Sequence, residues 1–347
     1  MKNNFGNWQP PADWLHISSL EMHTGGEPLR IITGGFPTLK GDTILEKRQY
    51  CLENFDDLRQ ALIFEPRGHA DMYAALITEP ERSDSHFGVL FLHNEGYSTM
   101  CGHAIIALSK AAVEAKVIAA VEGINELRID SPAGLITSYI EVVNGAATNI
   151  YFNNVASFVS LKQQIAKVEG IGNVTFDLAY GGAFYAYVDA EKIGLDLSIS
   201  NHDQIIASGQ KIKAAVQSQF AIEYPGQPDL SFLYGVIFIS HQQTLNADAH
   251  SRNVCIFAEG ELDRSPTGTG VSGRAAIHFA NNELSLNQAI TIESILGTSF
   301  EVKVVATSEV AQYPAVIPQI NGMAYVTGSN EFYIDPHDPL KQGFILR

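Results

Sequence analysis

The chain has 347 residues, of which 46% are hydrophobic and 17% charged, and its formal net charge is −16. This length exceeds what one hydrophobic core usually serves, so two domains are expected. The acidic balance argues against nucleic acid and anionic membranes as partners, because both attract basic surfaces. Three widely spaced cysteines form neither a disulfide framework nor a zinc pattern. Residues 1–8 contain no signal-like apolar core, so a cytoplasmic protein with reduced thiols is expected.

The first half begins with a Gly-Gly turn at residues 24–27 that leads into a strand-like run, residues 29–33. Residues 88–92 are apolar and bounded by turn residues, which predicts a buried strand. A small-residue loop at 100–103 then opens an alanine-rich segment, 104–118, which has apolar residues at helical spacing and no proline. This segment predicts a largely buried helix.

The second half repeats this order of elements. A Gly-Gly turn at 180–183 precedes another strand-like run, and residues 191–216 are expected to add helix to this half. Residues 253–257 predict a buried strand. The loop at 263–269 contains several small residues and opens a second helical segment, 270–282.

A further match supports an internal repeat. The pattern isoleucine, acid, serine and, later, glycine occurs at 129–134 and again at 292–297. Several matches in the same order predict a two-fold pseudo-repeat. Many short strands with few helices predict an α+β fold with mixed sheet. The expected halves are residues 1–157 and 158–334, and the sequence leaves open whether 335–347 returns to the first half.

The two loops that open the helices predict a binding site for a small carboxylate. Backbone N–H groups at a helix N-terminus bind anions, and two such ends facing one cleft would hold a carboxylate between them. The same donors would stabilise the charge that moves onto the carboxylate when a proton leaves the adjacent carbon. The residues expected to supply these contacts are Gly102, His103, Gly268 and Thr269.

Cys101 and Thr267 occupy matching positions in the two halves, yet only one of them can act as a base. A helix N-terminus lowers the pKa of a thiol and favours the thiolate, whereas a threonine hydroxyl stays protonated. We therefore predict α-proton abstraction by Cys101. His103, beside this cysteine, is a further candidate for proton transfer. From the residues alone, Asp263 fits a substrate contact and an ion pair with Arg264 equally well.

Six motifs of this chain resemble the proline racemase family, over residues 20–345. The resemblance implies a fold like that of diaminopimelate epimerase, in which two α/β halves each wrap mixed sheet around a central helix and the site lies between them. It also implies a homodimer, a small imino-acid substrate, and no metal or organic cofactor. The motifs lie at residues 22–28, 68–72, 100–103, 179–182, 263–270 and 335–339.

The chain departs from the racemases of that family at Thr267, where they have a second cysteine. Inversion at Cα needs a titratable group on each face of the ring, so the departure disfavours racemisation. The pairing of Cys101 with Thr267 resembles family members that dehydrate trans-3-hydroxy-L-proline, in which the α-hydrogen and the 3-hydroxyl lie on one ring face. The product would be Δ2-pyrroline-2-carboxylate, which tautomerises to the Δ1 imine. The resemblance further implies that Asp263 holds the ring nitrogen.

Two alternatives stay open from the sequence. One is an isomerase, either a proline racemase or a 4-hydroxyproline 2-epimerase. The other is an amino-acid-binding protein without activity, although binding alone would need only the backbone amides. Metal chemistry is not expected, because His23, His69 and His93 lack the spacing of metal ligands.

Overall fold

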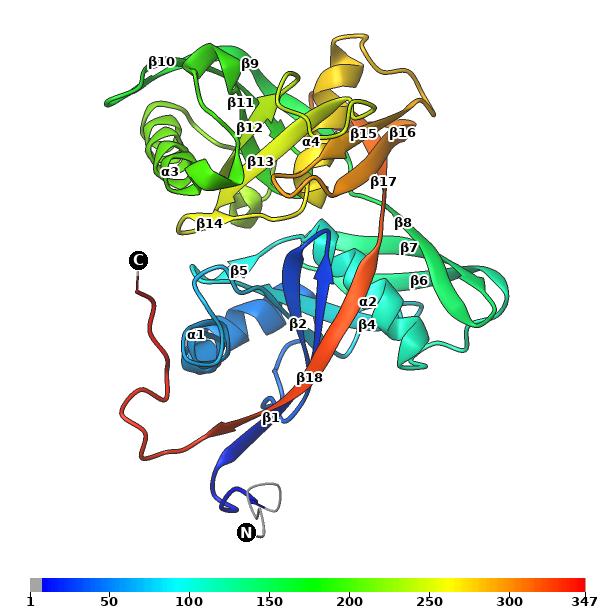
Figure 1. Ribbon diagram of the computed structural model, residues 1–347. Helices are drawn as coiled ribbons and strands as arrows, with labels where there is room; N and C mark the ends of the chain where they lie inside the picture. The colour runs from blue at the N-terminus through cyan, green and yellow to red at the C-terminus, as the bar shows by residue number, and fades with distance from the viewer. Residues whose placement is uncertain (1–7, 347) are drawn as a thin grey trace.

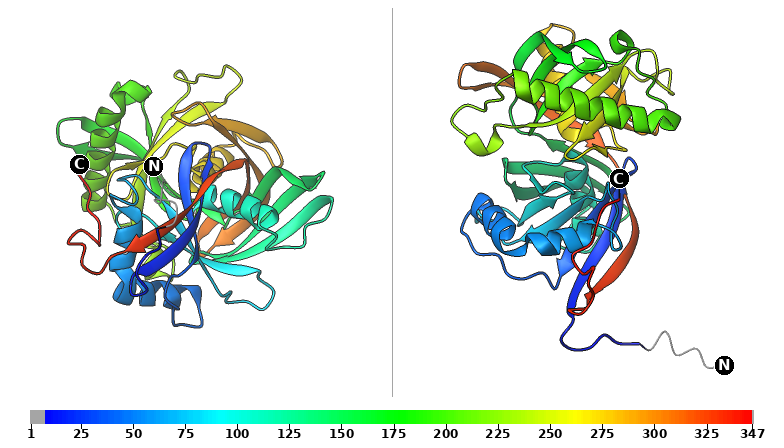
Figure 2. Two further views of the ribbon diagram at one scale, coloured as in Figure 1. Left: turned by 60° about the horizontal axis from the view of Figure 1, so that its bottom comes forward. Right: turned by 90° about the vertical axis from the view of Figure 1, so that its left-hand side faces the viewer.

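The computed structural model describes residues 8–346 and consists of two α/β halves, one above the other in Figure 1. Each half wraps curved sheet around one central helix, α2 or α4, which packs against strands on several sides (Figure 2). The first half contains β1 (Leu15–Thr24), β2 (Glu27–Gly34), α1 (Ile44–Ile63), β3 (Ala74–Thr78), β4 (Phe87–Leu92), β5 (Tyr97–Ser98), α2 (Gly102–Glu114), β6 (Gly123–Ser131), β7 (Gly134–Val143), β8 (Ala146–Asn153) and β18 (Ala324–Ile334).

The second half follows the same plan. Its elements are β9 (Ser157–Val168), β10 (Gly172–Tyr180), β11 (Phe184–Asp189), α3 (His202–Gln219), β12 (Leu233–Ser240), β13 (Ser251–Phe257), β14 (Glu261–Leu262), α4 (Gly268–Ala280), β15 (Ala289–Glu293), β16 (Ser299–Val310) and β17 (Tyr313–Gly322). Short 3₁₀ turns at Glu191–Ile193, Ile199–Asn201 and Pro228–Leu230 flank α3. None of the helices within residues 8–346 is both long and apolar enough to span a bilayer.

The strand pairings confirm the predicted repeat. The order is β18-β1-β2-β3-β4-β6-β7-β8 in the first half and β9-β10-β11-β12-β13-β15-β16-β17 in the second. In both halves the third and fifth pairings are parallel and the others antiparallel. Because β17 also pairs with β8, the sheets of the two halves are continuous.

The predicted helices and strands lie close to their expected positions, with one helix missed. α2 and α4 each begin two residues before the predicted start, directly after the small-residue loops. α1 was not anticipated, because its apolar residues are sparse and only one face is buried. A capping box, in which Thr43 and Glu46 exchange side-chain and backbone hydrogen bonds, marks the start of α1. This Thr-x-x-Glu pattern could have predicted a helix start from the sequence.

The expected boundary at residue 334 lies too late in the chain. β18 pairs antiparallel with β1 along its length, so the chain returns to the first half at Ala324. Figure 1 shows this strand running from the upper half down beside β1. The sequence of a strand reveals its periodicity but not which distant strand it pairs with.

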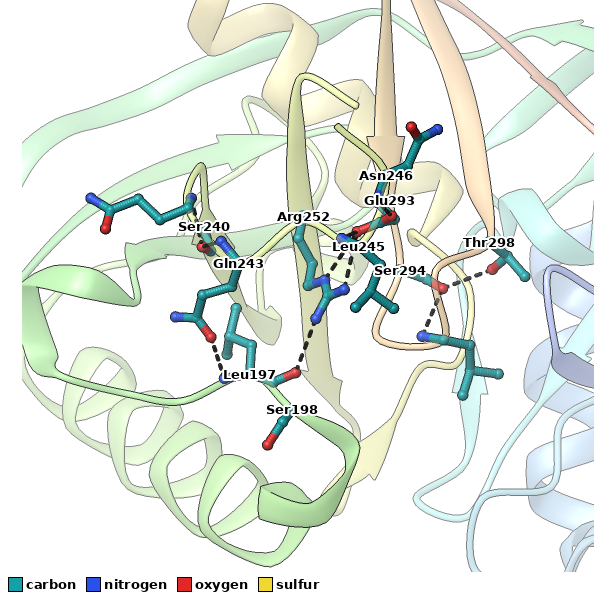
Figure 3. Close-up of polar contacts among 12 residues, drawn as sticks. Leu197, Ser198, Ser240, Gln243, Leu245, Asn246, Arg252, Glu293, Ser294 and Thr298 are labelled. Atoms are coloured by element: carbon teal, nitrogen blue, oxygen red, sulfur yellow. Dashed lines mark hydrogen bonds and ion pairs between the residues drawn. The ribbon is translucent and has the colours of Figure 1, made fainter. Parts of the chain in front are cut away.

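The acids that align in the repeat, Asp130 and Glu293, have the same structural role in both halves. Each is buried and accepts hydrogen bonds from two consecutive backbone N–H groups, at 2.8 and 2.9 Å for Asp130 and at 2.7 and 2.8 Å for Glu293. Each also pairs with an arginine, Arg82 at 2.8 Å and Arg252 at 3.1 Å. Figure 3 shows the Glu293 network, in which the carboxylate fixes the loop that follows β12. Buried charges of this kind are stable when paired and hydrogen-bonded.

The Gly-Gly turns join the two halves. The Thr298 hydroxyl (Figure 3) donates to the Gly25 carbonyl at 2.7 Å, and the Thr99 hydroxyl donates to the Gly182 carbonyl at 2.8 Å. Gly25 and Gly182 both have positive φ, at 61° and 105°, a conformation that favours glycine. Each turn is therefore held by a threonine from the opposite half, next to the ends of the central helices.

Candidate active site

The first turns of α2 and α4 face each other where the two halves meet. Cys101 is the N-cap residue of α2 and Thr267 that of α4, and neither side chain forms a capping hydrogen bond of ordinary geometry. The helices approach so closely that a Cβ on Gly268 would lie 2.6 Å from the Cα of Gly102. Two uncapped helix ends in contact form a positive site suited to an anion.

A cavity lies between these helix ends, and all seven predicted site residues line it. Its free volume is about 20 Å³, room for little more than one water molecule, so a ring-sized ligand requires the halves or their side chains to move. A larger groove of about 910 Å³ lies elsewhere on the second half, near Lys162 and Glu309, and is lined by no cysteine or histidine. The lining of the small cavity is Tyr73, Met100, Cys101, Gly102, His103, Tyr185, Tyr234, Phe257, Asp263, Thr267, Gly268 and Thr269.

The electrostatics of Cys101 differ from the expectation. Burial raises the pKa of its thiol well above the ordinary value, although hydrogen bonds from the Ala104 backbone and the Tyr73 hydroxyl act in the opposite direction. The helix end therefore does not by itself produce a thiolate, because the cost of removing the charge from water outweighs it. A positive charge brought into the cavity by a ligand would lower the pKa again.

His103 lies directly against the thiol, with Nδ1 3.2 Å from Sγ of Cys101. Burial lowers the pKa of its imidazole to about 3, and a hydrogen bond with the Pro28 backbone counters this only partly. The ring is therefore neutral near pH 7. Because a neutral imidazole has one N–H and one acceptor nitrogen, the ring can bond to the Pro28 carbonyl and still accept the thiol proton. The Thr24 hydroxyl donates to the His103 carbonyl at 2.8 Å and fixes the start of the helix.

Thr267 contacts Asp263 on the opposite side of the cavity. Its hydroxyl donates to Oδ2 of Asp263 at 2.7 Å, while the backbone N–H of Ser265 donates to Oδ1 at 2.7 Å. Burial nevertheless raises the pKa of the Asp263 carboxyl. Thr267 has a φ of 68°, unusual for a β-branched residue, which indicates that the loop holds it there. The Thr267 hydroxyl, on the side of the cavity opposite Cys101, is thus already bonded to Asp263.

Arg264 does not form the direct side-chain ion pair with Asp263 that the sequence left open. Its guanidinium pairs with Asp71 of the first half at 2.8 Å, and its backbone N–H donates to the buried Glu27 at 2.7 Å. Burial raises the pKa of the Glu27 carboxyl well above the usual value. These contacts hold the loop before Thr267 against the first half.

Sequence analysis missed the aromatic wall of the cavity, formed by Tyr73, Tyr185, Tyr234 and Phe257. Tyr73 directly follows the motif at 68–72, and Tyr185 follows the second Gly-Gly turn. Both could therefore have been chosen as candidates from their neighbouring motifs. Tyr234 and Phe257 lie in strands, where nothing local distinguishes a residue facing a cavity from one in the core. Among residues 8–346, no group of three or more His, Cys, Asp or Glu side chains is placed to hold a metal ion.

Comparison with known proteins identifies relatives along nearly the whole chain. A protein of Colwellia psychrerythraea named trans-3-hydroxy-L-proline dehydratase is 56% identical over 346 residues, covering 99% of this chain and 97% of the relative. The human protein of that name is 41% identical over 336 residues, covering 95% of each.

Solved structures give the same family and confirm the predicted fold. A probable proline racemase of Agrobacterium radiobacter is 29% identical, with a TM-score of 0.90 over 95% of this chain and 96% of that one. A hydroxyproline epimerase of Agrobacterium vitis with bound trans-4-hydroxy-L-proline is 27% identical, with a TM-score of 0.91 over 97% and 96%. The family model described as proline racemase matches residues 19–345, and the chain belongs to the proline racemase family.

Proposed function

We propose that the protein is an enzyme that dehydrates trans-3-hydroxy-L-proline to Δ2-pyrroline-2-carboxylate, which tautomerises to Δ1-pyrroline-2-carboxylate. The observation that carries the proposal is the asymmetry of the cavity, with a thiol at the end of α2 and a threonine at the matching end of α4. The names of the dehydratase relatives support it. Racemisation would need a second base where Thr267 presents a hydroxyl already bonded to Asp263.

The substrate fits the polarity of the cavity. Its carboxylate would accept hydrogen bonds from backbone N–H groups of Gly102, His103, Gly268 and Thr269, at the two helix ends. Its positively charged ring nitrogen would lie against Asp263. This charge, placed in a site of low dielectric, favours both the ionised carboxylate of Asp263 and the thiolate of Cys101. The positive charge that favours these two ionised groups therefore comes from the substrate itself. No metal or organic cofactor is required.

Elimination then needs only one face of the ring. The thiolate of Cys101 removes the α-proton, and the helix ends stabilise the charge that develops on the carboxylate. The Cα–C3 double bond forms as the C3–O bond breaks. The departing oxygen takes a proton from the thiol of Cys101, directly or through His103, and leaves as water. The cysteine is returned to its thiolate form.

We infer a cytoplasmic homodimer with free thiols, from the family resemblance and from the three cysteines, which are buried and free in the structure. Light scattering of the purified protein tests the dimer.

Three substrates test the activity. Incubation with trans-3-hydroxy-L-proline should yield an imine, detected by reduction with borohydride to proline. L-Proline and trans-4-hydroxy-L-proline should keep their optical rotation. Loss of rotation with L-proline, without imine from the 3-hydroxy substrate, would support a racemase instead. Binding of all three without any conversion would support a binding protein.

The variant Thr267→Cys should gain activity as a racemase or epimerase. It places a thiol on the second ring face, where a proton can be returned from the side opposite Cys101. The exchange also removes the hydroxyl that donates to Asp263, so the dehydratase activity should fall. Polarimetry with L-proline and trans-4-hydroxy-L-proline measures the gain. Thr267→Ser, which keeps the hydroxyl and adds no base, is the matched control and should show none. Equal rotation loss in both variants would contradict the one-base explanation.

A further inference from the structure

The Tyr234 hydroxyl is buried and has no partner at ordinary hydrogen-bond distance among the described residues, although it lies close to the Tyr73 hydroxyl. Tyr234 lies on β12, is 5% exposed, and lines the cavity between the helix ends. Its ring is fixed by neighbouring aromatic side chains, with centroids 5.4 Å from Phe257 and 5.9 Å from Tyr185. A buried hydroxyl without a partner destabilises a fold, so its position in a ligand cavity indicates a contact completed by the ligand.

The other side-chain hydroxyls of the cavity already have protein partners. Tyr73 shares a hydrogen bond of 2.5 Å with Ser98, and Tyr185 shares one of 2.7 Å with Thr269. The hydroxyl of Thr267 is bonded to Asp263. Tyr234 therefore holds the one side-chain hydroxyl in this lining without a hydrogen bond of ordinary length, and a ligand can replace its loose contact with Tyr73.

The polar groups of the substrate can be assigned by elimination. The helix ends take the carboxylate, Asp263 takes the ring nitrogen, and Cys101 takes the α-hydrogen. The remaining group is the hydroxyl on C3, which lies on the same ring face as the α-hydrogen. Tyr73 hydrogen-bonds to Cys101 and lies beside Tyr234. The Tyr234 phenol is therefore separated from the cysteine by one side chain of the cavity wall.

We propose that the Tyr234 hydroxyl donates a hydrogen bond to the C3 oxygen of the substrate, which selects a 3-hydroxylated ring and assists departure of the oxygen. The inference rests on the proposed dehydratase function and deepens it. Because burial raises the pKa of the phenol well above its ordinary value, Tyr234 stays protonated and acts as a donor. The donor stabilises negative charge on the oxygen as the C3–O bond breaks. The proton that completes the water still comes from Cys101, so the phenol is unchanged at the end of the reaction.

The variant Tyr234→Phe tests the proposal. It removes one oxygen that has no hydrogen bond of ordinary length to the protein, so thermal stability should be nearly unchanged. For trans-3-hydroxy-L-proline, kcat/KM should fall about 10²- to 10³-fold, as for loss of one donor to developing charge. L-Proline lacks the 3-hydroxyl, so its inhibition constant as a competitive inhibitor should stay within about 2-fold of the wild-type value, since no hydrogen bond to it is lost. Tyr180→Phe removes another buried phenol, outside the cavity, and should leave both values unchanged.

The outcomes separate this inference from the proposed function. A wild-type protein that does not convert trans-3-hydroxy-L-proline would overturn the function itself. An active wild type with an equally active Tyr234→Phe variant would overturn only the inference. Equal losses in kcat/KM and in the affinity for L-proline would show that Tyr234 shapes the whole cavity, which would also overturn a specific contact with the 3-hydroxyl.

Discussion

Replacing Cys101 with serine is expected to abolish turnover of trans-3-hydroxy-L-proline while leaving the fold intact. The change swaps sulfur for oxygen at a buried N-cap position, so packing changes little. A serine hydroxyl does not ionise near neutral pH, and loss of a general base costs roughly 10²- to 10⁴-fold in rate. We expect the larger loss here, because Thr267, at the matching position of α4, offers no second base. The imine assay measures turnover, and circular dichroism checks the fold.

Cys51→Ser is the matched control for this variant. Cys51 is a buried cysteine on α1 that accepts a hydrogen bond from Tyr97 at 3.5 Å, and it does not line the cavity. Burial raises the pKa of its thiol to about 11, so it is inert near neutral pH. Its replacement should preserve activity. If Cys101→Ser kept more than about a tenth of the wild-type rate, another group would be the base.

The predicted site residues come together in one cavity, and the sequence could group them because they cluster around short local signals. The loops before α2 and α4 combine small residues, glycine and a helix start, and these features depend on neighbouring residues alone. The aligned acids Asp130 and Glu293 pointed to the repeat, and both proved to bind backbone N–H groups in the same way. Features of this kind are encoded within a few residues of each other.

What the sequence did not reveal depends on contacts between distant segments. β18 pairs with β1, which lies at the opposite end of the chain. Tyr234 lines the cavity from β12, a strand far along the chain from Cys101. The pKa of Cys101 was expected to fall, but burial by both halves raises it. Local sequence indicates that a thiol stands at a helix end. It does not indicate how much water the fold removes from around that thiol.

The close approach of the two helix ends leaves no room for a side chain at Gly268. Gly268→Ala should reduce kcat/KM by roughly 10²-fold, because a displacement of about 1 Å in the reacting groups has an effect of this size. The added Cβ would lie 2.6 Å from the Cα of Gly102, and backbone atoms cannot rotate away as side chains do. The helix ends must separate, which moves the donors for the carboxylate apart and shifts Thr267 and Asp263 away from Cys101.

Overpacking of this kind should also lower the free energy of unfolding by about 1–3 kcal/mol, although alanine is intrinsically the better helix former. Gly328→Ala is the control, since nothing lies within 4 Å of the Cβ that it would add. That variant should match the wild type in both activity and thermal unfolding. Full activity in Gly268→Ala would mean that the working enzyme holds its helix ends further apart than the closed structure does, and that the carboxylate is bound by one helix rather than shared between two.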